Sequence, residues 1–593
     1  MEFLRAGEQS IHNEPGGEAS LILSGECESS LPLKAGDSVH PAAEEPGRIK
    51  VRALADSTIL RIPREALRRV LSRWQGSTSP ERRIEVVHPP TGSRTGGRLA
   101  ALFPISEGIP CLAIADELAR VIVRETGGRV LRLQVDEMHV GRTWSPTPVP
   151  GEGGVFLQRV QDGKDPLRLG QWLDRARQEF PYVLVEVARN AGVEAFRQVV
   201  LRSWAIYPLL RQNGESLFEL NLLVKEAIAE GFSEIPIKPL VYLEHAENGH
   251  GLSRYISGMI RRPVHMYLRE PAAGDLLGMR PALRRLGREI CDRQVGLALS
   301  SGAARGLSHI GVIQVLEENG IEVDVVAGSS MGAYIAAVWG VGYGGREMEQ
   351  FARELEGYRG LWGLLDMAIY PRRGFLLTKR VRRRLERTIG ESHFSDMKRP
   401  IRLVATRLDT LERTIFSGGS LVDAVLASIA IPGICVPVTI DGVSYIDGGI
   451  CDPLPVDVLV DMGIHRIIAV NTIATPEILH ACKLEIEERM RNGGLLGKAN
   501  RLLNPFAMGN VFDTMMRSIH AAQTRMAEAS CRRANVVLRP YCCQGKWHDF
   551  GNPSRYIPLG REEAESKLPA IRALIESPTH EHEPPIRMLE QAA

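Results

Sequence analysis

The chain has 593 residues, of which 44% are apolar and 24% are charged, and both values are close to the globular average. This composition excludes a disordered, collagenous or coiled-coil protein, and at roughly 150 residues per domain the length suggests about four domains. The 73 basic and 71 acidic residues leave a net charge of +2, so no bulk field attracts nucleic acid or an anionic membrane. Any binding of lipid or nucleotide must come from local sites.

The nine cysteines form no C-x-x-C pair and no zinc-binding spacing. Their odd number and scatter favour free thiols in a reducing compartment. The opening sequence MEFLRAGEQSIHNEPGGEAS has no apolar core of a signal peptide, and no uninterrupted apolar stretch reaches the roughly 18 residues of a membrane-spanning helix. We therefore expect a cytoplasmic protein, either soluble or peripheral at a membrane, with no metal site and no cofactor.

Residues 1–78 contain short strand-like runs separated by turn residues. The runs ASLILSG, LPLKAGD and IKVRALADSTILRIP precede PREALRRVLSRW, in which Pro63 favours a helix start. Their order resembles the later strands and closing helix of a cyclic-nucleotide-binding domain, with the first strands missing. The resemblance implies a truncated β-roll at the start of the chain.

The stretch HPAAEEPGRIKVRA stands where that family holds ribose and the cyclic phosphate. Arg48 offers a cation there, but the neighbouring Glu44 and Glu45 would repel a phosphate. We therefore expect a structural or docking role for the β-roll and no binding of cyclic nucleotide.

Residues 79–96 are rich in Pro, Ser and Arg and are predicted to form a linker. Residues 97–290 then alternate strand-like segments (RLAALFPI, RVLRLQVD, PYVLVEV) with helical ones (IADELARVIVRETG), which favours a parallel sheet with crossovers. The layout resembles a P-loop NTPase of the partition-ATPase type. However, FPISEGIPCLAIADELA lacks the Gly-rich run and the Lys-Ser/Thr pair that bind phosphate and magnesium. We expect a degenerate scaffold domain without ATPase activity.

From residue 294 the chain carries three short motifs. In the first, the predicted strand QVGLALS runs into the small-residue turn SGAARGLSHIG and then into a helix. Such a turn leaves backbone N–H groups unpaired and pointing one way, which suits a developing oxyanion as well as a phosphate. This turn alone does not distinguish between the two.

The second motif is G-x-S-x-G, formed by Gly328, Ser330 and Gly332 between a β-branched strand and a small-residue helix. This context is typical of a nucleophile elbow, where the serine sits on a strained turn and the glycines avoid collisions with the helix and the adjacent strand. The helix N-terminus favours an alkoxide. We predict Ser330 as the nucleophile, with Ser329 as the alternative position.

No histidine completes a three-residue site, because none of those after Ser330 follows a strand in a Gly- or Asp-rich loop. His309, in the first turn of a predicted helix, is expected to pack or to cap. The third motif, SYIDGGICDPLPV, instead ends a strand at Asp447, followed by Gly448 and Gly449. A carboxylate there can accept a proton directly from a serine, although an Asp-Gly turn without a catalytic role is the open alternative.

The three motifs in this order resemble the patatin-like phospholipase family over residues 294–460, with support from LVDAVLASIAIPGICVPVTIDGVSYIDGGICDPLPV. The N-terminal layout and the stretch ANVVLRPYCCQGKWHDFGNPSRYIPLGREEAE resemble the neuropathy target esterase branch and its bacterial relatives. The resemblance implies an α/β fold. Its catalytic core is a three-layer α/β/α hydrolase domain, with residues 461–593 as a C-terminal extension, and a degenerate P-loop-like domain and a truncated β-roll precede it.

The resemblance also implies roles for single residues. The serine of G-x-S-x-G is acylated in the family and the Asp of D-G-A/G is its base, which correspond to Ser330 and Asp447. The small-residue turn corresponds to the oxyanion hole, and its residues here are Gly302, Ala303, Ala304, Arg305 and Gly306.

This chain departs from the family in that turn, because Ser301 and Ala303 stand where the family has glycines. The backbone N–H groups survive such replacements, but a Cβ at a position with positive φ costs about 1 kcal/mol or more. Losing one oxyanion donor costs on the order of 10²–10³ in rate. Since neither side chain is large or β-branched, we expect negative φ at both positions.

The leading hypothesis is a serine esterase that hydrolyses carboxylic esters of phospholipids or lysophospholipids through an acyl-enzyme, with no nucleic acid as partner. The altered turn motivates a first rival, a weakly active or inactive protein that binds lipid or regulates. The β-roll motivates a second, a nucleotide-responsive sensor. The sequence MRNGGLLGKANRLLNPFAMGNVFDTMMRSI is predicted either as an interfacial patch or lid, or as a buried core helix.

Overall fold

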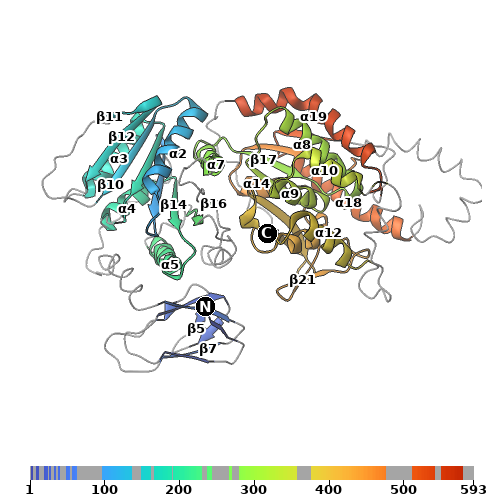
Figure 1. The fold of residues 1–593 in the computed structure, drawn as a ribbon, viewed down its shortest axis with the longest axis horizontal. Coiled ribbons are helices and arrows are strands. Elements are labelled where there is room, and N and C mark those ends of the chain that lie inside the picture. Colours follow the sequence, from blue (N-terminus) through green and yellow to red (C-terminus); the bar gives the residue numbers. More distant parts are fainter. Residues whose placement is uncertain are drawn as a thin grey trace, which may run out of the picture. The chain divides into compact units, whose positions relative to one another are not determined.

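The computed structural model divides into two compact units, Met1–Cys291 and Asp292–Ala593, drawn in Figure 1. Each unit contains its own largely parallel sheet with its own hydrophobic core. The structure describes strand segments within residues 1–62 and then residues 96–136, 149–161, 166–189, 191, 193–229, 237–243, 266–269, 279–354, 356, 376–475, 511–540 and 549–577.

The start of the chain forms short strands, as the spacing of its turn residues predicts. The strands are Glu2–Leu4 (β1), Gln9–His12 (β2), Ala19–Ser24 (β3), Glu26–Glu28 (β4), Pro32–Lys34 (β5), Ser38–Val39 (β6), Ile49–Ala53 (β7) and Ser57–Ile62 (β8). They pair in two four-stranded antiparallel sheets, β1-β8-β3-β6 and β2-β7-β4-β5. The helix predicted after Pro63, the predicted linker up to residue 95 and the acidic stretch before Arg48 lie outside the described residues.

The rest of the first unit contains an eight-stranded sheet. Its strands are Arg98–Pro104 (β9), Val130–Asp136 (β10), Val149–Pro150 (β11), Val155–Gln161 (β12), Tyr182–Val187 (β13), Ala205–Leu210 (β14), Leu240–Leu243 (β15) and Met266–Arg269 (β16). The order is β11-β12-β10-β13-β9-β14-β15-β16, and every pair is parallel except β11 with β12. The predicted strands RLAALFPI, RVLRLQVD and PYVLVEV are β9, β10 and β13.

Helices cover both faces of this sheet, which explains why its strands are apolar on both sides. Leu99 and Ala101 of β9 pack on one face, while Ala100 and Leu102 pack on the other. The first face is covered by Pro166–Glu179 (α3), Val193–Arg202 (α4) and Gly214–Ala229 (α5). The second face is covered by Cys111–Thr126 (α2) and Arg280–Ile290 (α7).

The turn from β9 into α2 stands where a phosphate-binding loop would stand in a P-loop protein. The backbone N–H of Arg211 donates to Ser106 Oγ at 2.7 Å. The Arg211 guanidinium donates to the carbonyl oxygens of Glu107 at 3.3 Å and Gly108 at 3.2 Å. This turn therefore directs carbonyl oxygens toward a cation, whereas a phosphate loop directs N–H groups toward an anion.

The second unit is built on another eight-stranded sheet. Its strands are Val295–Leu299 (β17), Val325–Ser329 (β18), Ile401–Arg407 (β19), Arg413–Phe416 (β20), Val438–Ile440 (β21), Val443–Asp447 (β22), Arg466–Val470 (β23) and Val536–Leu538 (β24). The order is β21-β22-β19-β18-β17-β23-β24, with β20 also paired to β19. The five neighbouring strands β19-β18-β17-β23-β24 are parallel to one another. Strands β20, β21 and β22 pair antiparallel at the β19 side.

Two helical layers enclose this sheet and make the three-layer α/β/α arrangement that the sequence predicts. Leu297 and Leu299 of β17 face one layer, whereas Ala298 faces the other. The first layer consists of Ser308–Glu318 (α8), Met331–Val341 (α9), Gly345–Arg353 (α10), Lys379–Ile389 (α12), Leu421–Ser428 (α13) and Pro553–Glu576 (α19). The second layer consists of Val456–Asp461 (α14) and Val511–Cys531 (α18).

Several expectations concern what the chain lacks, and they can be examined only over the described ranges. There, no helix is both long enough and apolar enough to cross a bilayer, and no cluster of three or more metal-ligating side chains could hold an ion. The described cysteines outside the first 62 residues are free thiols, as their spacing predicts: Cys111, Cys291, Cys435, Cys451 and Cys531. Most of the segment predicted as a lid or a core helix lies outside those ranges, and its last residues, 511–519, begin α18.

Candidate active site

Ser330 lies on a sharp turn between β18 and α9. Its backbone has φ 53° and ψ −120°, a region that residues with a Cβ rarely adopt. The residue is 4% exposed and is the N-cap of α9, so it lies at the positive end of the helix dipole. The strand, the strained turn and the helix are those of a nucleophile elbow.

The two motif glycines are required by close approach of the backbone. A Cβ at Gly328 would lie 2.5 Å from the carbonyl oxygen of Gly332. A Cβ at Gly332 would lie 2.2 Å from the carbonyl oxygen of Leu299, the last residue of the neighbouring β17. Both distances are far below van der Waals contact, so the expected collisions with the following helix and the adjacent strand are confirmed.

Asp447 ends β22 and meets Ser330 although 117 positions separate them. Ser330 Oγ donates to Asp447 Oδ2 at 2.6 Å, and the N–H of Gly449 donates to Asp447 Oδ1 at 2.7 Å. Burial raises the pKa of Asp447 to about 6, while the hydrogen bonds from Ser330 and Gly449 act in the opposite direction. The pair can therefore exchange a proton near neutral pH without a histidine between them.

No described histidine forms a hydrogen bond with either Ser330 or Asp447. His309, in α8, is fully buried and packs as expected, and its Nε2 donates to the carbonyl oxygen of Ser300 at 2.9 Å. Burial lowers the pKa of His309 to about 4, so the ring is neutral at physiological pH. Three later histidines are described, His393, His465 and His520; the others, His480, His548, His580 and His582, lie outside the described residues.

The turn after β17 leads into a short 3₁₀ helix, Ala303–Leu307 (η3). The N–H of Arg305 donates to the carbonyl oxygen of Gly302 at 3.1 Å. In the described part of the chain, the N–H groups of Gly302, Ala303 and Ala304 donate to no backbone carbonyl outside the helix. These three amides are the donors that remain for an oxyanion from the predicted turn.

The prediction of negative φ at both replaced glycines is wrong for Ala303. Ala303 has φ 50°, whereas Ser301 is outside the positive region. The preceding residues are fixed against Thr472, whose Oγ1 donates to the carbonyl oxygen of Ser301 at 3.0 Å. Ala303 connects these held residues to η3 in the left-handed conformation, where a Cβ costs about 1 kcal/mol.

Buried side chains from distant elements hold this turn in place. The N–H of Thr472 donates to Ser300 Oγ at 2.9 Å, and a Cβ at Gly302 would lie 2.0 Å from Thr472 Oγ1. A Cβ at Gly306 would lie 2.6 Å from Cγ of Met331, the first residue of α9. The turn is thus packed against the helix that begins at the predicted nucleophile.

The two glycines after Asp447 also fill tight places. A Cβ at Gly448 would lie 2.1 Å from the carbonyl oxygen of Val404. Gly449 is enclosed by side chains, because its Cβ would lie 2.7 Å from Ser301 Oγ, 2.8 Å from Gln523 Nε2 and 2.9 Å from Asp447 Oδ1. Ser301, one of the two departures from the family turn, therefore occupies space that the absent Cβ of Gly449 leaves open.

Some residues at the site carry no sequence motif. The N–H of Ser330 donates to Ser428 Oγ at 2.9 Å, and Ser428 Oγ donates to the carbonyl oxygen of Val404 at 2.5 Å. Ser428 ends the helix of LVDAVLAS, and the helix was part of the resemblance, but nothing marked this serine. α18 contributes Gln523 and His520. Burial and the nearby Arg305 lower the pKa of His520 to about 4. No sequence spacing indicates either residue.

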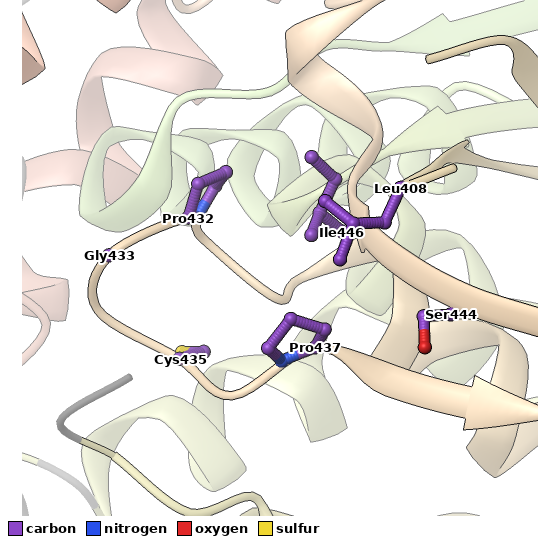
Figure 2. A pocket seen from close by; sticks show the side chains of 7 residues that line it. All are labelled: Leu408, Pro432, Gly433, Cys435, Pro437, Ser444 and Ile446. Carbon is purple, nitrogen blue, oxygen red and sulfur yellow. The ribbon is translucent and has the colours of Figure 1, made fainter. Parts of the chain in front are cut away.

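A pocket of about 460 Å³ lies beside the strand that ends at Asp447. Its lining, shown in Figure 2, consists of Leu408, Pro432, Gly433, Cys435, Pro437, Ser444 and Ile446. The N–H of Asp447 donates to the carbonyl oxygen of Ala430 at 2.9 Å, which holds the chain just before the loop of residues 432–437 (the pocket loop) against that strand. Burial, with a smaller contribution from Asp447, raises the pKa of Cys435 to about 11, so the thiol is neutral and the pocket wall is mainly apolar.

Residues 297–460 match the family model described as Patatin-like phospholipase. These residues span the turn after β17, the nucleophile elbow and the end of β22, so the match covers every motif of the site. This part of the second unit is therefore similar to the patatin-like phospholipase family, and its sheet lies between two helical layers.

Curated relatives point to one branch of this family, the neuropathy target esterase (NTE) branch. Lysophospholipase nte1 of Aspergillus fumigatus is 31% identical over 221 residues, which are 37% of this chain and 14% of the relative. An uncharacterized NTE family protein of Mycobacterium tuberculosis is 37% identical over 180 residues, which are 30% of this chain and 49% of the relative. The chain thus matches half or less of the length of these relatives.

Similarity to solved structures is weak. A ParA family ATPase from Chlorobium tepidum aligns with 34% of this chain and 93% of its own, at 14% identity and a TM-score of 0.26. VipD from Legionella pneumophila aligns with 47% of this chain and 67% of its own, at 14% identity and the same TM-score of 0.26. Scores this low decide nothing about the fold of either unit.

Proposed function

We propose that the protein is a serine esterase that hydrolyses carboxylic esters of phospholipids or lysophospholipids. The observation that carries this proposal is the 2.6 Å hydrogen bond from Ser330 Oγ to Asp447 Oδ2. A hydroxyl on a strained elbow, bonded to a buried carboxylate whose pKa is raised to about 6, is poised to lose its proton. The match of this domain to the patatin-like model and the name lysophospholipase of several relatives support the lipid substrate.

Acylation begins when Asp447 takes the proton of Ser330 Oγ and the oxygen attacks the ester carbonyl carbon. A tetrahedral intermediate forms, and its negative oxygen accepts hydrogen bonds from the free amides of Gly302, Ala303 and Ala304. The ester C–O bond then breaks, and Asp447 returns the proton to the leaving alcohol. The products of this half-reaction are the free alcohol and an acyl-enzyme on Ser330.

Deacylation repeats the chemistry with water as the nucleophile. Asp447 takes a proton from water, the resulting hydroxide attacks the acyl carbonyl, and the same amides stabilise the second tetrahedral intermediate. The bond from the acyl carbon to Ser330 Oγ breaks, Oγ regains a proton, and the fatty acid leaves. The cycle uses no group besides this chain and water.

The raised pKa of Asp447 supplies a driving force that an exposed aspartate lacks. A carboxylate at its ordinary pKa of 3.8 is a weak base toward a serine hydroxyl, and each unit by which the pKa rises is worth about 1.4 kcal/mol of proton affinity. Desolvation inside the site also strengthens the attraction between the fixed amides and the negative charge that develops on the carbonyl oxygen.

The positive φ of Ala303 motivates a second candidate function. If the strain displaces the three amides from convergence, the site retains a serine and a carboxylate but stabilises the oxyanion poorly. The protein would then be a weakly active or inactive member that binds or regulates lipid. A cytoplasmic location and peripheral contact with membranes are part of the proposal under either candidate.

The test is turnover of a p-nitrophenyl ester and release of fatty acid from lysophosphatidylcholine by the full chain, with and without cyclic nucleotide. The Ser330→Ala variant should lose both activities, by on the order of 10⁵-fold or more, together with labelling by a fluorophosphonate probe. Ser329→Ala is the matched control, since that neighbouring hydroxyl is fully buried and forms no hydrogen bond within the described residues. Retained labelling of the Ser330→Ala variant would contradict the proposal, and stimulation by the nucleotide would favour a sensor.

A further inference from the structure

Helix α12 is strongly basic although the whole chain is nearly neutral. Its sequence, KRVRRRLERTI, contains six cationic residues and one acidic residue. Leu385 and Ile389 point into the core and are 1% and 2% exposed. These two residues fix the rotation of the helix, so the opposite side is presented to solvent.

Two of its cations are neutralised by neighbours. Arg382 pairs with Asp423 of α13 at 2.5 Å, and Arg384 pairs with Glu354 at 2.9 Å. Three others, Lys379, Arg383 and Arg387, are exposed and form no ion pair within the part of the chain that the structure describes, and the one acidic residue of the helix, Glu386, pairs with Arg382 at 3.9 Å. Residues four apart lie on one side of a helix, so these three form a single line of unpaired positive charge, which we call the basic stripe.

The basic stripe begins next to the apolar pocket. Leu376 lies three residues before Lys379, and its N–H donates to the carbonyl oxygen of Ile434 at 2.8 Å. The carbonyl oxygen of Leu376 in turn accepts from the N–H of Val436 at 3.0 Å. The approach to α12 is thus paired edge to edge with the pocket loop.

Two exposed leucines lie in the hairpin that contributes to the pocket wall. Leu408, which lines the pocket, is 43% exposed, and Leu411 in the same β19–β20 hairpin is 66% exposed. Leu411 also has φ 60°, a conformation that favours glycine or asparagine. Neither packing in the core nor backbone conformation favours a leucine at this position.

We propose that this edge of the second unit docks on an anionic lipid bilayer. The basic stripe binds the phosphates of the headgroups, and Leu408 and Leu411 enter the acyl boundary beside the pocket. The docking itself does not depend on hydrolysis, but its purpose rests on the proposed function, because it would bring ester substrates to the pocket side of Asp447. Asp409 of the same hairpin does not oppose docking strongly, since it is paired with Arg407 at 2.7 Å.

The observations favour a membrane over a nucleic acid. A nucleic acid would present phosphates to the basic stripe but would offer nothing apolar to Leu411 and the pocket, and no aromatic side chain for stacking lines that pocket. A bilayer presents both: headgroup phosphates for the basic stripe and, directly beneath them, an apolar acyl layer for the leucines. The net charge of +2 requires any such attraction to be local, as it is here.

The experiment is co-sedimentation with vesicles of phosphatidylcholine, with and without phosphatidylglycerol. The full chain is used in the Ser330→Ala background, so that no hydrolysis alters the vesicles. Basic residues near an anionic surface contribute about 1 kcal/mol each, so Lys379→Gln, Arg383→Gln and Arg387→Gln together should weaken binding to the anionic vesicles about a hundredfold. Arg532→Gln, Lys567→Gln and Arg572→Gln, which remove the same charge from exposed positions elsewhere, should change it less than threefold.

A second variant tests the apolar side. Leu411→Asn should raise the melting temperature, since asparagine tolerates its φ of 60°, yet weaken vesicle binding about tenfold. Equal binding to neutral and anionic vesicles, or unchanged binding by the stripe variant, would overturn the proposal. If the chain with the intact stripe binds duplex RNA, and the stripe variant loses that binding but keeps its binding to vesicles, the stripe is a nucleic-acid site instead. If the Ser330→Ala chain binds the anionic vesicles but the wild-type chain shows no esterase activity, docking stands and the proposed function is refuted.

Discussion

Both units contain a largely parallel sheet covered by helices on both faces, and they differ in the turn that follows a central strand. In the first unit the turn after β9 is closed by Arg211, whose guanidinium bonds to two carbonyl oxygens of the turn. In the second unit the turn after β17 has three amides that donate to no carbonyl oxygen of the described residues outside the helix, and the turn after β18 presents Ser330 to Asp447. A parallel sheet covered by helices offers a site at the carboxyl ends of its strands, but a few side chains decide whether that site is open.

The comparison also shows how a closed turn is stabilised and an open one is strained. The first unit satisfies its turn internally, with Ser106 Oγ accepting from the backbone of Arg211. At its candidate site, the second unit keeps positive φ at Ala303 and Ser330, and among the described residues no cation pairs with the buried carboxylate of Asp447. Strain and unpaired charge at one place are typical of a functional site.

The largest effect should come from replacing Asp447, the carboxylate that accepts the hydrogen bond from Ser330. Asp447→Asn should lower kcat/KM by on the order of 10⁴-fold, because Asp447 is the acceptor of the Ser330 hydroxyl and no other described side chain accepts from it. Asn accepts the same hydrogen bond from Ser330, so circular dichroism and fluorophosphonate labelling should separate lost chemistry from lost fold. Loss of the same size in His309→Ala, whose ring bonds only to Ser300, would show that the two-residue mechanism is wrong.

The pH dependence gives the control for that variant. The folded pKa of about 6 lies above the ordinary 3.8, so the base is present above pH 6 and is lost as the pH falls through it. kcat/KM should therefore fall about tenfold per unit below pH 6. The same shift means that the folded state binds its proton more tightly, so wild-type stability relative to Asp447→Asn should decline as the pH rises from 3.8 to 6.

A smaller effect should follow from closing the space around Gly449. Gly449→Ala would place a Cβ 2.7 Å from Ser301 Oγ and 2.9 Å from Asp447 Oδ1, and the displaced carboxylate should lower kcat/KM about a hundredfold. Ser301→Gly in the same chain removes the nearer contact and should restore at least part of the loss. Additive losses in the double variant would contradict this coupling between the altered turn and the Asp-Gly-Gly motif.

The sequence predicts the local parts of this site well, because each depends on neighbours in the chain. A strand, a glycine, a serine and a small-residue helix define the elbow within a few positions, and Gly328 and Gly332 fill the places expected of them. Asp447 is likewise marked by its own glycines. The three-layer fold is implied by the resemblance of these motifs to the patatin-like family and not by any single motif.

The parts that sequence could not predict are contacts between distant segments. Gln523 of α18 reaches Gly449 from more than 70 positions away, and Ala303, with φ 50°, follows Ser301, whose carbonyl oxygen accepts from the distant Thr472. The same holds for Arg211, which closes the turn of the first unit about 100 positions away. No periodicity or spacing encodes such contacts, since they are fixed only when the strands pair.

A still smaller effect should come from opening the closed turn of the first unit. Arg211→Met removes two hydrogen bonds to carbonyl oxygens and should lower the stability of that unit by about 1–3 kcal/mol. Esterase kcat/KM should remain within twofold, and neither wild type nor variant should show a shift in melting temperature with Mg-ATP. A shift of several degrees with Mg-ATP would mean that the first unit holds a nucleotide and that the contrast between the units is misplaced.

The smallest effect concerns Ala303, and it decides between the two candidate functions. Ala303→Gly relieves a Cβ at φ 50°, which is worth about 1 kcal/mol, but glycine also gains freedom in the unfolded chain. The net gain should be a few tenths of a kcal/mol, which differential scanning calorimetry can measure. Ala304→Gly is the matched control, because that neighbour is buried and outside the positive region, so it should lose stability.

The activity of the same variant is the sharper measurement. If the amides of Gly302, Ala303 and Ala304 already converge, freeing one φ gives them no better position, and kcat/KM should change less than about tenfold, or 1.4 kcal/mol. A rise of a hundredfold or more would mean that the natural turn holds its donors apart. The turn of the second unit would then stabilise an oxyanion poorly although it is open. In that case the second candidate function, binding of lipid without efficient hydrolysis, would be favoured.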